Sequence, residues 1–259
     1  MLLENRVAIV SGIGPGMGRD VSLALAREGA NIVLAARGAD KLKAVGDEVR
    51  ALGRRAVEVP TDIASNDDCV ALVAAAVKEL GRVDILVNNA FKGGVEPLFV
   101  DADLAEWRKV FDVNVFGSLQ LTQAVIPHMR RQGGGSIVFI NSMSMRVIEP
   151  RFAGYASSKG ALMIAAQSLA RELGPEKIRV NSVVPGYIWG AALEGYFKTL
   201  AKQQGVTPDD IYKAIASRTA LHHIPTSEEI ADAVLFFASD LSRAITGQAL
   251  DVNGGHFFH

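Results

Sequence analysis

The chain has 259 residues, of which 49% are hydrophobic, and a formal net charge of −1 at pH 7. This length can bury a sizeable core, and the balanced charge gives no electrostatic reason to expect nucleic acid or an anionic membrane as a partner. No apolar run is long enough to span a bilayer and the N-terminus lacks the layout of a signal peptide, so we expect a cytoplasmic protein.

The first predicted element is a short buried strand at residues 6–10, which runs into a glycine-rich loop and then into a helical pattern. Glycines let the backbone approach a pyrophosphate closely, and the following helix offers free N–H groups and the positive end of its dipole. The spacing is G-x-x-x-G-x-G rather than the stricter G-x-G-x-x-G, and a glycine-rich turn without a ligand is the alternative. The residues predicted to contact a dinucleotide here are Gly12, Gly14, Gly16, Met17 and Gly18.

Strand-like runs alternate with helical patterns along most of the chain. Further strands are predicted at residues 31–35, 56–59, 84–87, 136–140, 178–183 and 249–252. Helices are predicted at residues 40–52, 66–80, 104–132, 155–173 and 227–239. Parallel strands joined by crossover helices produce such an alternation. The expected fold is therefore α/β, a single domain over residues 1–259 with a Rossmann-type doubly wound parallel sheet and helices on both faces.

The end of the second predicted strand bears on the choice of cofactor. A dinucleotide-binding fold often places an acidic residue there to hydrogen-bond the adenosine ribose, but this chain has Ala36 followed by Arg37. A guanidinium is planar and permanently charged, which suits a 2′-phosphate. We therefore favour NADP(H) over NAD(H), although NAD(H) stays open, and a solvent-facing Arg37 is the alternative reading of this residue.

Tyr155 and Lys159 lie four residues apart in a predicted helix, and Ser142 precedes them after an apolar strand. The spacing places Tyr155 and Lys159 one turn apart on the same helix face. A free phenol titrates near about 10, and an adjacent ammonium stabilises the phenolate, so Lys159 is expected to lower the pKa of Tyr155. Tyr155 then becomes a usable acid–base catalyst, and Ser142 can hydrogen-bond the oxygen that receives the proton. An exposed Tyr–Lys pair without chemistry is the alternative.

Residues 187–225 break the alternation, because glycine, proline and aromatic residues are scattered through short helical pieces. We expect this segment to be an insertion that forms a substrate loop over the carboxyl ends of the strands, where ligands bind in open α/β sheets.

Taken in order, these motifs resemble those of the classical short-chain dehydrogenase/reductase family, and the resemblance runs from about Val7 to Gly255. Each motif alone is unspecific, but the complete set in one order is not plausibly chance. The matching residues are Gly12, Gly16, Gly18, Asp62, Ile63, Asn88, Asn89, Ala90, Asn114, Ser142, Tyr155, Lys159, Pro185, Gly186 and the run 251–255.

The resemblance implies a role for each catalytic residue. Tyr155 would be the general acid in carbonyl reduction and the base in alcohol oxidation, while Lys159 would also hydrogen-bond the nicotinamide ribose. Ser142 would orient the substrate oxygen, and Asn114 would hold a water that links Lys159 to solvent. An asparagine that merely fills a helix irregularity is the alternative for Asn114.

The resemblance also implies cofactor contacts outside the glycine-rich loop. They are Asp62 and Ile63 at the adenine, Asn89 and Ala90 along the cofactor, Pro185 and Gly186 after the sixth strand, and Ile188 at the carboxamide. The chain departs from the family pattern at Phe91, which replaces a glycine, at Trp189, where a threonine is usual nearby, and at Pro15, where many NADP-using relatives carry a basic residue.

The residues that flank Ser142 and Tyr155 or follow Gly186 are expected, by the same analogy, to line the substrate pocket. They are Phe91, Met143, Met145, Phe152, Tyr187 and Trp189, with Tyr196 and Phe197 in the insertion and Phe257 and Phe258 at the edges. Packing of the insertion onto the sheet is the alternative for its aromatic residues. This apolar and aromatic set predicts a bulky hydrophobic ketone or secondary alcohol as the substrate.

Other chemistries find little support in the sequence. Cys69, the only cysteine, lies in an apolar helical pattern that favours packing, and Ser142 lacks the G-x-S-x-G elbow of an esterase. The histidines lack the spacing of metal ligands, so no metal is expected; they are His128, His222, His223, His256 and His259. Family members are commonly tetramers joined through the helices expected at 104–132 and 155–173, which predicts a homotetramer.

Two functions stay open at this point. The first is an NADP(H)-dependent oxidoreductase that interconverts a small-molecule secondary alcohol and ketone by hydride transfer. The second is a dinucleotide-binding protein that senses redox state or acts as a scaffold without turnover. The presence of Asn114, Ser142, Tyr155 and Lys159 favours the enzyme.

Overall fold

The aliphatic runs of the sequence form one parallel sheet whose central strands are buried on both faces. Every residue of β1 and β4 is buried, as expected for strands covered by helices on both sides. The strand order in space is β3-β2-β1-β4-β5-β6-β7, and all neighbours are parallel. This computed structural model describes residues 1–258, and its strands are β1 (Val7–Ser11), β2 (Asn31–Ala36), β3 (Ala56–Pro60), β4 (Ile85–Asn88), β5 (Gly135–Ile140), β6 (Ile178–Pro185) and β7 (Ala249–Val252).

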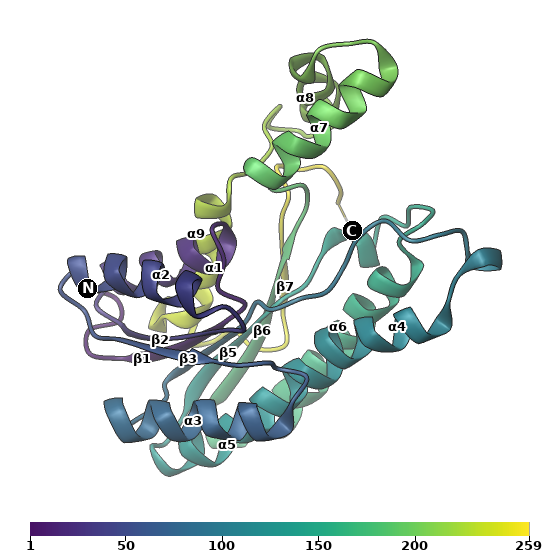
Figure 1. Ribbon diagram of the computed structural model, residues 1–259. Coiled ribbons are helices and arrows are strands. Elements are labelled where there is room, and N and C mark those ends of the chain that lie inside the picture. The colour runs from purple at the N-terminus through teal and green to yellow at the C-terminus, as the bar shows by residue number, and fades with distance from the viewer. Residues whose placement is uncertain (259) are drawn as a thin grey trace.

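Helices cover both faces of this sheet (Figure 1). One core cluster lies between the sheet and α1, α2 and α9, and a second lies between the sheet and α3, α5 and α6. The helices are α1 (Met17–Arg27), α2 (Ala39–Ala51), α3 (Asn66–Leu80), α4 (Leu104–Phe111), α5 (Ser118–Arg131), α6 (Ala153–Leu173), α7 (Ala191–Gln204), α8 (Pro208–Ala216) and α9 (Ser227–Ala238). The predicted doubly wound α/β fold is thus confirmed, and each predicted strand is present with ends that differ by at most two residues.

The strand order reverses between β1 and β4. From β1 the chain first winds outward through β2 to β3, and it then returns to place β4 on the other side of β1. Loops that leave neighbouring strands in opposite directions open a crevice at the carboxyl edge of the sheet, which is the usual ligand site of such folds. The glycine-rich loop follows β1 and the segment Asn89–Phe91 follows β4, so both border this crevice.

The helical stretch predicted at residues 104–132 is present, but its middle is not α-helical. It consists of α4 and α5 joined by a π-helical segment, Asp112–Gly117, which contains Asn114. Gly117 packs closely against the loop after β3. A Cβ atom, which glycine lacks, would lie only 2.8 Å from the backbone oxygen of Ile63 at this position. Single π-helical turns are often found at functional sites, and this one directs the Asn114 side chain inward, where it is fully buried.

The predicted insertion contains two further helices, α7 and α8, which stand clear of the sheet in Figure 1. They enclose a hydrophobic cluster of their own, centred on Phe197, Ile211 and Ile224. Phe197 and Ile224 are fully buried in this cluster. The insertion is therefore held together by its own packing rather than by packing onto the sheet. Among residues 1–258, no helix has both the length and the apolar composition needed to cross a membrane.

Candidate active site

Ser142, Tyr155 and Lys159 meet at the carboxyl end of β5. Ser142 follows the last residue of β5 by two positions, and Tyr155 and Lys159 lie in the first two turns of α6. Lys159 is 3% exposed, and its Nζ donates a hydrogen bond of 2.7 Å to the backbone oxygen of Ile140 in β5. The same Nζ lies 5.7 Å from the centre of the Tyr155 ring. The three side chains predicted to be catalytic are thus brought together by one helix and one strand.

Burial controls the pKa values of the two titratable groups. Burial raises the pKa of the Tyr155 phenol, and a hydrogen bond with Ser142 acts in the opposite direction. Burial also lowers the pKa of the Lys159 ammonium from 10.5 to about 7. The expectation that Lys159 lowers the pKa of Tyr155 therefore does not hold for the chain by itself. Dehydration of the phenol dominates, and at neutral pH Lys159 is itself only partly charged.

Ser142 is held in place by the short turn that follows it. Its Oγ accepts hydrogen bonds from the backbone N–H of Ser144 (3.2 Å) and from the Ser144 hydroxyl (3.0 Å). Met143 continues this turn and approaches the end of β6, since a Cβ on Gly186 would lie 3.2 Å from the Met143 sulfur. The turn after β5 and the turn after Pro185 therefore border the same region.

Asn114 uses its carboxamide to fix the loop after β4. Its Oδ1 accepts from the backbone N–H of Lys92 (2.7 Å), and its Nδ2 donates to the Lys92 carbonyl (2.9 Å) and to the Ser158 hydroxyl (2.9 Å). Ser158 immediately precedes Lys159, so Asn114 ties the loop to the catalytic helix. No hydrogen bond between Asn114 and Lys159 is present in the described part of the chain, and a water relay through Asn114 stays a prediction.

Glu96 is a site residue that the sequence analysis missed. Its carboxylate accepts hydrogen bonds from the backbone N–H groups of Gly154 (2.8 Å) and Tyr155 (2.9 Å), and so it caps the first turn of α6. A second hydrogen bond joins the loop after β4 to the segment before α6, because the Glu96 N–H donates to the Arg151 carbonyl at 2.7 Å. A carboxylate at a helix N-terminus is favoured both by the free N–H groups and by the helix dipole.

The glycine-rich loop is shaped by close backbone packing. Gly12 has a φ of +77°, and a Cβ there would lie 2.5 Å from the Cα of Ala90. A Cβ on Gly18 would lie 2.4 Å from the Gly12 carbonyl oxygen. Asn89 completes the arrangement, since its Nδ2 donates to the carbonyls of Ser11 (3.0 Å) and Gly12 (2.9 Å). Asn89 therefore supports the loop with its side chain rather than presenting it to a ligand.

The remaining glycines of this loop face open space. No described atom lies within 4 Å of the position that a Cβ would take on Gly14 or Gly16. Helix α1 begins directly afterwards, at Met17, and no described side chain caps its first N–H groups. A loop that leaves space beside an uncapped helix N-terminus can accept a phosphate group.

A cleft of about 600 Å³ runs from the end of β2 to the loop after β4. It brings together predicted residues from four loops: Gly12, Arg37, Asp62, Ile63, Asn89, Ala90 and Phe91. Arg37 is exposed at one end, and Lys41 from α2 lines the same cleft. Sequence analysis missed Lys41, although a lysine four residues after Arg37 at the start of a helix is a readable signal.

Three other predicted cofactor contacts do not line this cleft. Pro185 is buried at the end of β6, and Met17 and Ile188 pack against the core cluster of α1 and α9.

Comparison with known proteins agrees with this geometry. The family described as Enoyl-(Acyl carrier protein) reductase matches residues 12–256. The 7alpha-hydroxysteroid dehydrogenase of Escherichia coli strain K12 is 36% identical over 253 residues, which cover 98% of this chain and 94% of that protein. The 3-oxoacyl-[acyl-carrier-protein] reductase FabG of Staphylococcus epidermidis is 32% identical, with 98% and 99% covered. The chain belongs to the short-chain dehydrogenase/reductase family.

Solved structures extend the similarity to the backbone. A 7 alpha-hydroxysteroid dehydrogenase complexed with NADH and 7-oxo glycochenodeoxycholic acid superposes with a TM-score of 0.88 at 36% identity, covering 98% of this chain and 94% of that one. An NAD⁺-bound xylitol dehydrogenase gives a TM-score of 0.91 at 28% identity, covering 98% and 100%. As a member of this family, the protein is an oxidoreductase with a nucleotide-binding Rossmann-type fold.

The residues predicted to line the substrate pocket of this short-chain dehydrogenase/reductase divide into two groups. Phe91 lies edge-on to the Tyr155 ring at 6.3 Å between centres, so it borders this tyrosine. Tyr187 lies 5.9 Å from the ring of His256 near the C-terminus. Met143, Met145 and Phe152 are half-buried in the segments that flank Ser142 and Tyr155. These positions are compatible with a shared pocket at the carboxyl edge.

Trp189 and Phe197 form the second group, and their place in a substrate pocket stays a prediction. Trp189 packs against Phe197 (5.7 Å between ring centres) and Tyr212 (4.7 Å) inside the insertion. Its ring lines a cavity of about 390 Å³ formed only by residues of the insertion. The cluster formed by α7 and α8 offers these rings more apolar contact than the sheet does, while Tyr196 stays 49% exposed. Phe258 is exposed, and Phe257 is half-buried.

The remaining candidates for chemistry have structural roles in this family member. Cys69 is fully buried, and burial raises the pKa of its thiol to about 11, which confirms the packing role. His223 pairs with Glu229 at 2.7 Å, and Arg131 contacts the His128 ring. No group of three or more potential metal ligands occurs within residues 1–258. His259 lies outside the described residues.

Proposed function

We propose that the protein is an NADP(H)-dependent oxidoreductase that interconverts a secondary alcohol and a ketone, with Tyr155 as the acid–base catalyst. The observation that carries the proposal is the meeting of Ser142, Tyr155 and Lys159 beside a dinucleotide-sized cleft. Membership of a family of oxidoreductases and similarity to a hydroxysteroid dehydrogenase support it.

The proposed proton path follows from the pKa values of the site. A bound nicotinamide would supply the hydride for reduction or accept it in oxidation. In reduction, the carbonyl carbon gains the hydride while Tyr155 gives its hydroxyl proton to the carbonyl oxygen, which completes the alcohol. Burial favours the protonated phenol before this step. Lys159, with a pKa of about 7, can take up or release a proton at neutral pH and so return one to Tyr155.

The cofactor proposal rests on the loops that border the cleft. Gly14 and Gly16 leave room for a pyrophosphate beside the uncapped start of α1. Arg37 and Lys41 supply two cations at the end of β2, where no carboxylate follows the strand directly. Two cations suit the 2′-phosphate of NADP(H) better than the ribose diol of NAD(H). The solved relatives are bound to NADH and NAD⁺, so a direct comparison of the two cofactors decides this point.

The substrate proposal is a bulky hydrophobic ketone or secondary alcohol, cyclic or aryl-bearing. Phe91 beside the catalytic ring, and Met143 and Tyr187 near the end of β6, support an apolar pocket. The hydroxysteroid dehydrogenase complex, which contains a polycyclic oxo compound, agrees with this class.

A substrate panel tests the proposed function. The purified protein would be assayed with NADPH and NADH against cyclic, aryl and sugar ketones of similar size. We expect the highest kcat/KM with NADPH and a cyclic or aryl ketone. Dinucleotide binding without turnover of any ketone or alcohol would favour the sensing or scaffolding function instead.

We further propose that the protein assembles as a homotetramer through α4, α5 and α6. Leu104 on α4, Ile164 on α6 and Phe116 in the π-helical segment between α4 and α5 are 51%, 60% and 55% exposed. Apolar side chains of this size on neighbouring helices favour a contact between subunits.

A further inference from the structure

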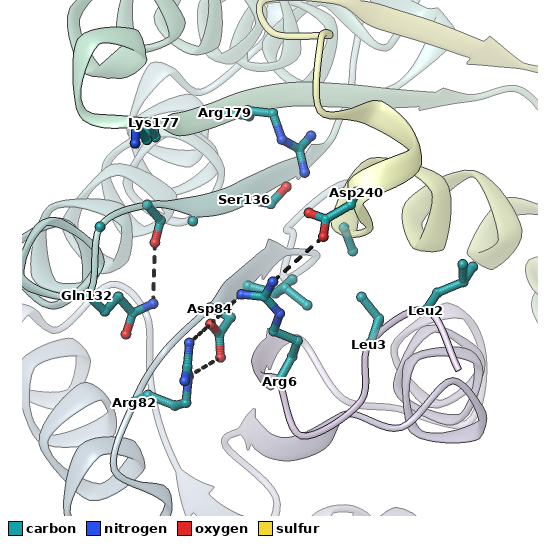
Figure 2. A pocket seen from close by; sticks show the side chains of 15 residues that line it. Leu2, Leu3, Arg6, Arg82, Asp84, Gln132, Ser136, Lys177, Arg179 and Asp240 are labelled. Atoms are coloured by element: carbon teal, nitrogen blue, oxygen red, sulfur yellow. Dashed lines mark hydrogen bonds and ion pairs between the residues drawn. The ribbon is translucent and has the colours of Figure 1, made fainter.

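A separate cavity lies at the opposite end of the sheet from the catalytic residues, where β4, β5 and β6 begin (Figure 2). Its volume is about 210 Å³, several times the roughly 30 Å³ that one water molecule occupies in the liquid. We call it the amino-end cavity. A molecule bound there would not meet the hydride-transfer site, which lies beyond the carboxyl ends of the strands.

The lining of the amino-end cavity has an excess of positive charge. Four cations and two carboxylates line it: Arg6, Arg82, Lys177, Arg179, Asp84 and Asp240. Asp84 is buried and receives hydrogen bonds from Arg82 (2.6 and 2.7 Å), from Arg6 (3.2 Å) and from a backbone N–H. Asp240 is mostly exposed and lies 3.7 Å from Arg6. The two carboxylates are therefore committed to Arg6 and Arg82, which leaves Lys177 and Arg179 uncompensated.

Arg179 is a half-buried cation of this lining whose hydrogen bonds go to neutral groups. Its Nη1 donates to the Ser242 hydroxyl (2.7 Å) and its Nη2 to the Ser239 carbonyl (3.1 Å), which are both neutral acceptors. No carboxylate of residues 1–258 lies within salt-bridge distance of it, although Asp240 is close enough to act on its charge. Burial lowers the pKa of this guanidinium, so its surroundings disfavour the positive charge. Buried cations in proteins are normally paired.

The geometry around Arg179 suits an anion. Figure 2 shows its guanidinium directed toward Ser136 and Asp240, while Lys177 lines the cavity at some distance from it. Lys177 is exposed and has no ion-pair partner among the described residues. We propose that the amino-end cavity binds a small oxyanion, such as a phosphate group, at Arg179, with Lys177 adding positive charge to the lining. Guanidinium and ammonium donors are the groups that proteins commonly use to hold phosphate oxygens.

Titration with inorganic phosphate tests this proposal. The full chain would first be saturated with NADPH or NADH, whichever binds, so that the glycine-rich loop and Arg37 are not available to phosphate. Calorimetry at constant ionic strength should then show saturable binding of phosphate and competition by sulfate, but not by chloride. Lys177→Gln should weaken phosphate binding about tenfold or more, because it removes one positive charge from the lining.

Two further variants complete the test. Lys78→Gln, which alters an exposed lysine on α3, should leave phosphate binding unchanged. Arg179→Lys keeps the charge and should weaken binding by losing the planar donor pair. If Arg179→Lys fails to fold, the phosphate affinity of Lys177→Gln alone decides the test, because a substitution of the exposed Lys177 side chain leaves the core intact. Absence of saturable binding, equal competition by chloride, or unchanged affinity in Lys177→Gln would overturn the proposal.

Discussion

Replacing Glu96 tests whether the loop after β4 positions the catalytic tyrosine. Both carboxylate oxygens of Glu96 accept N–H groups from the first turn of α6, one of them that of Tyr155 itself. The same loop also contacts the tyrosine ring, because a Cβ on Gly93 would lie 3.0 Å from a Tyr155 ring carbon. Glu96→Ala removes both hydrogen bonds and the charge, whereas Glu96→Gln keeps an acceptor oxygen for one of them.

The expected loss of stability is modest, and the expected loss of turnover is larger. Removing an N-terminal cap costs about 1 kcal/mol, and losing a negative charge at a helix N-terminus costs about 0.3–1 kcal/mol more. In a domain of this size, each kcal/mol lowers Tm by about 2–4 °C. Catalysis is more sensitive, because a misplacement of about 1 Å can reduce turnover about a hundredfold. We expect Glu96→Ala to lower kcat about tenfold or more. The kcat of Glu96→Gln should lie between those of the wild type and of Glu96→Ala.

Steady-state kinetics measured across pH, together with Tm, distinguish a role of Glu96 in positioning Tyr155 from a loss of overall stability. Burial and Ser142, rather than Glu96, shift the pKa of Tyr155, so the Glu96 variants should lower kcat without moving the pH profile. Glu79→Gln is the matched control, since Glu79 is exposed on α3, which does not carry this loop. Wild-type kcat in Glu96→Ala, or an equal loss in Glu79→Gln, would refute the positioning role.

Three further outcomes follow from the site and from the helix surfaces. Ser142→Ala removes the hydrogen bond that lowers the pKa of Tyr155, so that pKa should rise and the ascending, acidic limb of the alcohol-oxidation profile should move to higher pH; an unmoved limb, or one moved to lower pH, would contradict the assignment. Arg37→Ala should weaken NADPH binding by about 1.5–3 kcal/mol and leave NADH binding nearly unchanged, and an equal effect on both cofactors would show that Arg37 is merely exposed. Light scattering at micromolar concentration should give the mass of a tetramer, and a monomer would exclude assembly through α4, α5 and α6.

The strands could be predicted closely because their signal is local. Runs such as those of β1 and β4 are aliphatic up to their last residue, and the glycine-rich loop and the Tyr155–Lys159 spacing are equally short-range patterns. The fold and the three central catalytic candidates were therefore readable from the sequence.

The π-helical segment between α4 and α5 could not be read in this way. Residues 104–132 keep a helical pattern, and the side-chain hydrogen bonds of Asn114 join it to Lys92 and Ser158, which are distant in sequence. Glu96 was missed for the same reason, because its cap on α6 spans 58 residues and arises from the path of a glycine-containing loop.

The pKa of Tyr155 was mispredicted because helix spacing says nothing about depth. Four-residue spacing places Lys159 one turn away, but only the structure shows that burial raises the pKa of Tyr155 and lowers the pKa of Lys159. The aromatic residues of the insertion illustrate a similar limit. Phe197 and Ala201 share one face of α7, yet the sequence does not reveal that this face meets α8 rather than the sheet.

Turnover by Tyr155→Phe tests the central claim most directly. The substitution removes only the hydroxyl group, so single-turnover hydride transfer should fall by about a hundredfold to ten-thousandfold while NADPH affinity stays close to that of the wild type. Tyr212→Phe, which alters a tyrosine packed against Trp189 inside the insertion, should retain activity. Hydride transfer at the wild-type rate in Tyr155→Phe would contradict the assignment of Tyr155 as the acid–base catalyst.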